Sequence, residues 1–317
     1  MQNMTPTERE AVALIERRLG VAVRVIERFP SGLANYVYDV QLVNGQRLVA
    51  RLASDAAGDS TRAAVYWNRL LRPRGVPLPR LLAYELRPAQ GTPYLLLERL
   101  PGQELGEVYP ALTRAQKRAL AERIVTIQRA VGQLPDGPGY GFARSYRDPD
   151  LLPGWLDVLR AQLARAREWI AGAGVVSVEY VARVEARLPA WAAYCATIAP
   201  RPFLDDTTTK NVLIEAGQLS GIVDVDCLCF GDPLFTVGLT RMALLSRAWD
   251  TDYIDEWTRL LRLDVRQRHA LDLYTAIFCV TFLGELGQAF NRDASAPVDS
   301  ARVARLLGVL ETLLERI

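Results

Sequence analysis

The amino-acid sequence predicts an α+β protein with two lobes, a small antiparallel sheet followed by a larger, mainly helical part. The first hundred residues contain five β-rich runs, and Pro101-Gly102 then interrupts the pattern. Beyond this break, apolar side chains recur with the period of a helix, apart from one short hairpin. We therefore expect an amino-terminal lobe over residues 1–100 and a helical lobe over residues 101–317.

The amino-terminal lobe is expected to open with a helix over residues 5–20, because Thr5 suits a capping position and Pro6 suits the first turn. Asn44-Gly45 then predicts a tight hairpin, since this dipeptide readily adopts the left-handed backbone of such turns. Five strands and one intervening helix complete the lobe. The strands are expected over Val21–Phe29, Tyr36–Val43, Arg47–Leu52, Arg80–Tyr84 and Pro93–Leu97, and the helix over Ser60–Arg72.

The second lobe is predicted to be helical except for Phe203–Val225, where two short β runs flank Ala216-Gly217 as a hairpin. Polar residues gather around this hairpin, which makes it the first place to look for a functional site. The helices are expected over Thr113–Gly132, Leu151–Ala171, Val178–Ala196 and from Pro233 to Ile317.

Composition excludes several classes of protein. With 38 basic and 36 acidic side chains the net charge is only +2, which argues against a dedicated nucleic-acid binder. The single histidine, His269, rules out a zinc site that needs two histidine ligands. The only lysines are Lys117 and Lys210, and neither follows a glycine, so the chain has no P-loop.

The chain is expected to be a cytoplasmic protein without a membrane partner. Its first twenty residues lack the apolar core of a signal peptide, and the most apolar run, Leu273–Leu283, is too short to span a bilayer. The four cysteines lie in apolar surroundings, as expected of buried, reduced thiols. The oligomeric state is left open.

Acidic and amide side chains recur at defined spacings around the predicted hairpin. Asp206 is followed by Asn211 after five residues, and Asp224 comes thirteen residues later. A lone Asp or Asn in a loop is usually a turn former. Taken together, however, carboxylate and amide oxygens around one hairpin suit Mg²⁺, which completes its shell with water and phosphate oxygens.

These residues resemble the aminoglycoside phosphotransferase group, the small-molecule branch of the protein-kinase-like fold. Kinases of this fold carry a catalytic Asp and, five residues later, a metal-binding Asn, which Asp206 and Asn211 match. In this family a second metal-binding Asp ends the next hairpin and precedes Gly-Asp-Pro, as Asp224 precedes Gly231-Asp232-Pro233. The resemblance covers roughly residues 25–245 and implies the two-lobed kinase-like fold.

The resemblance extends to the nucleotide side. Ser31 and Gly32 look like part of the family's phosphate-covering loop, and Arg51 occupies the place of the third-strand lysine. Glu98 and Leu100 fall in a segment similar to the hinge against which adenine is bound. The implied phosphate donor is ATP, with GTP as the alternative, bound with Mg²⁺.

The resemblance also implies residue roles. Asp206 would accept the proton of the acceptor hydroxyl or orient that hydroxyl, while Asn211 and Asp224 hold Mg²⁺. Lys210 either places a cation near the transferred phosphate or is a solvated loop charge. Asp205 is a rival base whose spacing to Asn211 is wrong by one residue. Asp226 is left open as an aid to a second metal, a substrate ligand or a surface-loop acid.

Three positions depart from the family pattern. Leu204 stands where a histidine usually precedes the catalytic Asp, and Arg51 replaces the lysine. Ala64 aligns with the helix glutamate that would pair with that lysine, and Ser60–Arg72 contains no acid. We predict a phosphotransferase acting on a hydroxyl of a small antibiotic or metabolite, with a catalytically silent binding protein of the same fold as the alternative.

The acceptor is expected to be a neutral or singly cationic, polyol-like molecule, because the acids after Pro233 are interspersed with arginines. Among those acids Glu285 stands out, since it follows an apolar run and a buried charge there needs a cationic partner. Aromatic residues of the same lobe, among them Trp155, Tyr274 and Phe278, equally suit a larger acceptor such as a macrolide.

Overall fold

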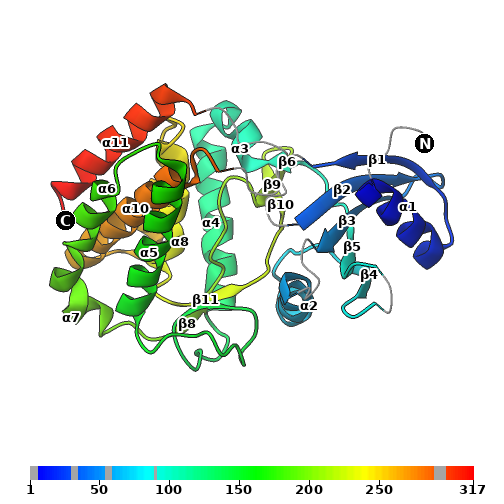
Figure 1. The fold of residues 1–317 in the computed structure, drawn as a ribbon, viewed down its shortest axis with the longest axis horizontal. Helices are drawn as coiled ribbons and strands as arrows, with labels where there is room; N and C mark the ends of the chain where they lie inside the picture. Colours follow the sequence, from blue (N-terminus) through cyan, green and yellow to red (C-terminus); the bar gives the residue numbers. More distant parts are fainter. Residues whose placement is uncertain (1–5, 30–34, 54–58, 89–90, 289–297) are drawn as a thin grey trace.

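The computed structural model describes residues 6–29, 35–53, 59–88, 91–288 and 298–317. Figure 1 shows a small sheet-containing lobe at the amino-terminal end of the molecule and a larger helical lobe at the other. The α+β, two-lobed fold class predicted from the sequence is confirmed. Thr5, the expected capping residue, and the loop residues Ser31 and Gly32 lie outside the described residues.

The first lobe is built on a five-stranded antiparallel sheet in the order β1-β2-β3-β5-β4. The hairpin expected at Asn44-Gly45 joins β2 to β3, with Gly45 at a φ of 85°. Helix α1 (Pro6–Leu19) contributes Ala11 and Ile15 to a core shared with the sheet. The strands are β1 (Val23–Arg28), β2 (Asn35–Leu42), β3 (Arg47–Ala53), β4 (Leu81–Glu85) and β5 (Tyr94–Glu98).

Helix α2 (Asp59–Leu71) follows β3 in sequence and packs against the second lobe. Its Trp67 is fully buried, and the indole Nε1 donates to the carbonyl oxygen of Ala143 at 2.8 Å. The ring also packs against Tyr146 and Phe230, with centroids 5.7 and 6.4 Å away. Trp67 and Leu71, in the carboxyl-terminal half of α2, therefore belong to the core of the helical lobe.

The second lobe is a set of helices around the buried α10. A capping box formed by Thr113 and Gln116 begins α4, and another formed by Asp264 and Gln267 begins α10. The helices are α3 (Leu105–Val108), α4 (Arg114–Val131), α5 (Trp155–Ala173), α6 (Glu179–Glu185), α7 (Ala192–Cys195), α8 (Leu234–Leu245), α9 (Asp252–Leu261), α10 (Val265–Glu285) and α11 (Ser300–Leu314).

One helix prediction was wrong. The segment Val178–Ala196 is not continuous, because α6 ends at Glu185 and a 3₁₀ turn over Leu188–Trp191 precedes α7. Pro189 explains the interruption, since proline has no backbone N–H and clashes with the preceding helical turn.

Two small sheets contain or border residues 204–226, the segment in which the functional site is predicted. The hairpin predicted around Ala216-Gly217 is confirmed, and its first strand also pairs with a strand just after Pro101-Gly102. Gly102 is required there, because a Cβ atom on it would lie 2.3 Å from the carbonyl oxygen of Ile214. The sheets are β10 (Gln218–Ile222), β9 (Val212–Glu215) and β6 (Gln103–Glu104), and β7 (Gly141–Ala143), β11 (Leu228–Gly231) and β8 (Arg201–Phe203).

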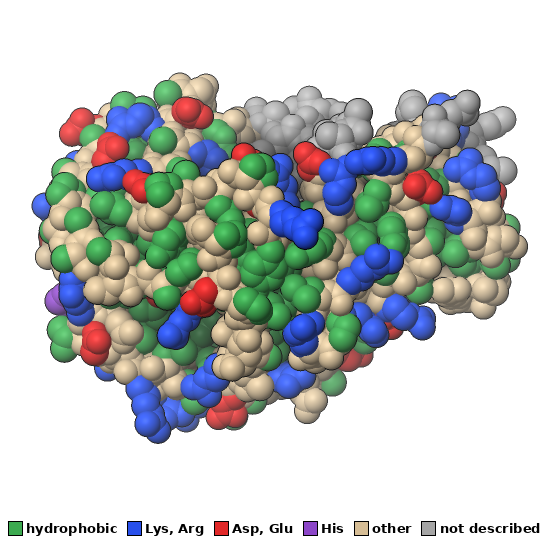
Figure 2. All heavy atoms as spheres, turned by 90° about the horizontal axis from the view of Figure 1, so that it is seen from below, with side chains coloured by type: hydrophobic (Ala, Val, Ile, Leu, Met, Phe, Trp, Pro, Cys, Tyr) green, Lys and Arg blue, Asp and Glu red, His purple; other side chains and the backbone are tan. Residues whose placement is uncertain are grey.

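The surface is mixed in character. On the face drawn in Figure 2, basic and acidic side chains are interspersed over both lobes, in keeping with the net charge of +2. His269 is exposed, and the four cysteines carry free thiols. Among the helices of the described residues, none is both long and apolar enough to cross a membrane.

Candidate active site

A glutamine on α4 holds the start of the predicted catalytic loop. Nε2 of Gln128 donates to the carbonyl oxygen of Leu204 at 2.8 Å, and its Oε1 accepts from the backbone N–H of Leu204 at 3.0 Å. Leu204 itself is buried where the family resemblance places a histidine. The loop is therefore anchored through its backbone, by a residue that the sequence did not single out.

Asp206 and Asn211 are joined within this loop. The Asp206 carboxylate accepts hydrogen bonds from the backbone N–H and the hydroxyl of Thr208 at 3.2 and 2.6 Å. The side-chain Nδ2 of Asn211 donates to the Asp206 carbonyl at 3.3 Å, which leaves the Asn211 amide oxygen as a ligand for a cation. Burial raises the pKa of Asp206, and the Thr208 hydrogen bonds oppose that rise.

Asp224 is placed beside Asn211 by the hairpin. The backbone N–H of Val223 donates to the Asn211 carbonyl at 2.9 Å, so the two candidate metal ligands flank the same end of β9 and β10. Asp224 has a φ of 60°, a left-handed conformation that is unfavourable for a non-glycine residue and is concentrated at functional sites.

This pair fits Mg²⁺. One amide and one carboxylate oxygen are the few protein ligands that Mg²⁺ takes when phosphate and water oxygens complete its octahedron. Within the described ranges, no cluster of three His, Cys, Asp or Glu side chains forms a ready-made metal cage. The donor set is thus suited to a metal that arrives with a phosphate ligand rather than to a permanently bound structural ion.

The Arg51 side chain, on β3 of the first lobe, contacts two acids of the second lobe. Its Nη1 donates to Asp224 at 3.0 Å and to Asp226 at 2.6 Å, and its Nη2 donates to the second oxygen of Asp226. Burial alone would lower the pKa of Arg51, but the charge and hydrogen bonds of Asp226 and the charge of Asp224 raise it overall.

Ala64, which stands where the resemblance expects the helix glutamate, lies on α2 in a small apolar cluster with Val65 and Leu95.

The neighbouring acid Asp205 differs from Asp206 in its surroundings. Burial raises the pKa of Asp205 to about 7, and the nearby charge of Asp206 adds to the rise. Its carboxylate accepts a weak hydrogen bond from the Cys227 thiol, with 3.7 Å between sulfur and oxygen. Lys210, in contrast, is exposed, and its charge acts on Asp206.

Helices α5 and α10 each deliver one charged side chain to the catalytic loop. Burial raises the pKa of Glu285, at the end of α10, against the opposing charges of Lys210 and Arg165. Burial lowers the pKa of Arg165 on α5, and Glu285 and Asp205 oppose that shift. An acid and a cation from these two helices therefore lie near the loop, and Glu285 is half-buried rather than a carboxylate in water.

The hinge residues lie where the two lobes join. Oε2 of Glu98 accepts from the backbone N–H of Arg80 at 3.1 Å, so its carboxylate fastens the approach to β4. The Leu100 side chain covers Gly221, where an added Cβ would come within 2.4 Å of it. Contacts of either residue with a nucleotide stay a prediction.

Asp232, in the Gly-Asp-Pro motif, has a structural task. Its carboxylate accepts hydrogen bonds from the hydroxyls of Tyr194 and Tyr274 at 2.7 and 2.8 Å and from the backbone N–H of Leu234 at 3.0 Å. The indole of Trp155 donates to the Tyr274 hydroxyl at 2.8 Å. This buried network ties α5, α7, α8 and α10 together behind the catalytic loop.

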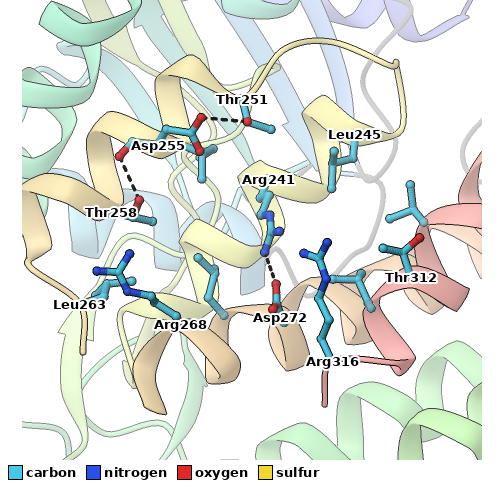
Figure 3. A pocket seen from close by; sticks show the side chains of 14 residues that line it. Arg241, Leu245, Thr251, Asp255, Thr258, Leu263, Arg268, Asp272, Thr312 and Arg316 are labelled. Carbon is cyan, nitrogen blue, oxygen red and sulfur yellow. Dashed lines mark hydrogen bonds and ion pairs between the residues drawn. The ribbon is translucent and has the colours of Figure 1, made fainter. Parts of the chain in front are cut away.

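A separate cavity of about 450 Å³ lies among α8, α9, α10 and α11 (Figure 3). Asp272 faces it and is paired with Arg241 at 2.6 Å, while Asp255 accepts from the Thr251 hydroxyl at 3.1 Å. None of its lining residues comes from the catalytic loop or the β9–β10 hairpin. These two acids are therefore directed away from the candidate active site.

The two lobes define a protein with the protein-kinase-like fold, and the Asp206, Asn211 and Asp224 arrangement is the one expected of a phosphotransferase. Residues 25–274 match the model of the phosphotransferase enzyme family, and the chain belongs to that family. The family resemblance and the prediction of a small-molecule phosphotransferase enzyme are thereby confirmed. No curated protein matches the sequence.

Solved structures show the same fold over nearly the whole chain. Aminoglycoside phosphotransferase APH(4)-Ia is 18% identical with a TM-score of 0.68, covering 98% of this chain and 99% of its own. The GDP complex of a mutant aminoglycoside 2′-phosphotransferase-IIIa is 16% identical with a TM-score of 0.65, covering 98% and 97%. A putative fructosamine-3-kinase from Thermobifida fusca YX-ER1 is 16% identical with a TM-score of 0.62, covering 96% and 98%.

Proposed function

We propose that the protein transfers a phosphoryl group from Mg²⁺-bound ATP or GTP to a hydroxyl of a small molecule. The observation that carries this proposal is the hydrogen-bonded loop and hairpin that place Asp206, Asn211 and Asp224 together opposite the buried Arg51. Similar structures support a nucleotide donor, since one contains GDP and another contains AMP-PNP with hygromycin B.

The proposed mechanism relies on positioning. Phosphoryl transfer passes through a loose transition state, so the protein mainly aligns the groups and balances charge. Asp206, held by Thr208, orients the acceptor hydroxyl and takes its proton. Asn211 and Asp224 would hold Mg²⁺, and the ion would neutralise charge on the nucleotide phosphates. Lys210 adds an exposed cation at the edge of the loop.

A neutral or singly charged acceptor suits the helical lobe better than a polycation. Among the acids after Pro233, the charge of Glu285 acts on the loop, and the cation of Arg165 accompanies it. Six other acids after Pro233 have local partners. Asp250 pairs with Lys117, Asp252 with Arg114, Glu256 with Arg259 and Asp272 with Arg241, while Asp255 accepts from Thr251 and Asp264 caps α10.

Three of the aromatic residues suggested for a macrolide acceptor do not line this site. Trp155, Tyr274 and Phe278 are buried and pack around Phe235 inside the lobe. They form core rather than a binding wall. The acceptor that fits best is consequently a small polyol or amino alcohol rather than a large apolar ring.

Leu204, Arg51 and Ala64 motivated the alternative of a silent binding protein, but other contacts replace the interactions that these positions lack. Gln128 anchors the loop at Leu204, and Arg51 has carboxylate partners although α2 supplies none. The residues expected nearest the transferred phosphate, Asp206, Asn211 and Asp224, are all present. These contacts favour an active enzyme over a silent one.

A thermal-shift experiment tests the donor. The purified protein is melted with ATP or GTP, each with Mg²⁺ and with EDTA, and a Mg²⁺-dependent rise in melting temperature is expected. Asp224→Asn should lose this rise, and Asp136→Asn, in an exposed loop, should keep it. If the wild-type protein shows no shift with either nucleotide, the proposal is wrong.

An acceptor screen tests the rest. Phosphoryl transfer is measured against small amino alcohols, polyols, macrolides and kanamycin-like compounds, and turnover is expected with the first two classes. Strong turnover of kanamycin-like compounds alone would overturn the preference for a weakly charged acceptor.

A further inference from the structure

We propose that Asp226 is the positioning residue for Arg51, in place of the acid that the family resemblance expects on α2. The inference rests on the proposed function, since Arg51 is taken to contact the nucleotide phosphates. The only acid of α2 is Asp59 in its first turn, which pairs with Arg62 and Arg144, so the cation needs a counter-charge from elsewhere. Asp226 provides it from the segment between β10 and β11.

The contact has the geometry of a strong ion pair. The two terminal guanidinium nitrogens of Arg51 each donate to one carboxylate oxygen of Asp226, Nη1 at a distance of 2.6 Å. Two parallel hydrogen bonds fix the orientation as well as the distance of the pair. The third guanidinium nitrogen, Nε, donates at 3.1 Å to the side-chain oxygen of Asn35 when that amide is turned toward the guanidinium, and Nη2 donates to the same oxygen at 2.6 Å.

Asp226 suits this role better than Asp224. The Asp224 side chain is 62% exposed and makes one hydrogen bond to Arg51, whereas that of Asp226 is 26% exposed and makes two. Asp224 can therefore turn to Mg²⁺ while Asp226 keeps Arg51 in place. The Arg51 side chain is only 5% exposed, and without an acid its buried charge would be uncompensated.

The same geometry explains why the strand carries arginine. A lysine presents a compact point charge, whereas the planar fork of arginine binds one carboxylate with two nitrogens and still offers a further donor. Arg51, Ala64 in place of the helix acid, and Asp226 then form one matched set. Two of the three departures from the family pattern thus belong to a single alternative arrangement.

The test measures nucleotide affinity and kinetics in the full-length protein. Asp226→Asn should weaken Mg²⁺-nucleotide binding by about tenfold or more in calorimetry, because it leaves a buried charge without its partner. The KM for nucleotide should rise by a similar factor, with a smaller fall in kcat, and Asp226→Glu should recover part of the affinity. Glu311→Gln is the matched control, since both oxygens of Glu311 on α11 accept hydrogen bonds from the guanidinium of Arg183 on α6, away from the site.

A second variant covers the case in which Asp226→Asn does not fold. Arg51→Lys keeps the charge but loses the fork, so it should also bind Mg²⁺-nucleotide about tenfold more weakly. Wild-type affinity in Arg51→Lys, or in a folded Asp226→Asn, would overturn the inference. Failure of the wild-type protein to bind nucleotide would instead reject the proposed function itself.

Discussion

Asp205 makes the stability of this protein depend on pH in a direction that can be worked out. Burial raises its pKa from the ordinary 3.8 to about 7, so the folded state binds the proton more tightly than the unfolded chain. Its contribution is most favourable below about pH 4, declines as the pH rises, and is fully lost above about pH 7. Each pH unit between the two pKa values changes the free energy of unfolding by roughly 1.4 kcal/mol. Between pH 5 and pH 8 the stability lost is therefore at most about 3 kcal/mol.

Asp205→Asn removes this ionisation, and urea unfolding at several pH values measures the result. Relative to wild type, the variant should gain up to about 3 kcal/mol in free energy of unfolding between pH 5 and pH 8. Comparing the two ends of the pH range cancels any constant effect of the substitution. The exposed Asp136→Asn serves as control and should follow the wild-type curve. Parallel curves for Asp205→Asn and wild type would refute the reasoning.

Three further predictions concern the catalytic loop. Asp206→Ala should lower kcat by on the order of 10²–10⁴-fold with nearly unchanged nucleotide affinity, whereas Asp205→Ala should keep most of the turnover; the reverse result would place the base one residue earlier. Asp224→Ala should weaken Mg²⁺-nucleotide binding in calorimetry, because a carboxylate is taken from the ion. Gln128→Leu should cost about 2–4 kcal/mol in urea unfolding and lower kcat, because two backbone groups of Leu204 lose their partner; a wild-type unfolding curve would argue against the anchor.

Features written in short stretches of sequence were predictable. The Asn44-Gly45 hairpin and the spacing from Asp206 to Asn211 depend on neighbouring residues, and the structure shows the turn and the hydrogen bond that joins the pair. The Pro101-Gly102 break was also visible, although the close approach of Ile214 that requires Gly102 was not.

Features that depend on distant partners were not predictable. Gln128 is an ordinary polar residue on a helix, and its contact with Leu204 spans 76 positions. Asp226 had three open interpretations, because its partner Arg51 lies 175 residues away in the other lobe. Strands of three or four residues, such as β7, β8 and β11, are too short to show an alternating pattern.

The burial of Trp67 determines what kind of control this enzyme permits. A helix that swings outward to turn a kinase off must be able to leave its lobe, yet α2 is fastened to the helical lobe by an indole hydrogen bond to Ala143 and by Tyr146 and Phe230. Moving it would expose a large aromatic side chain and orphan a buried N–H group. We therefore expect α2 to stay in place through the catalytic cycle, which makes a conformational switch in α2 a costly way to regulate this enzyme.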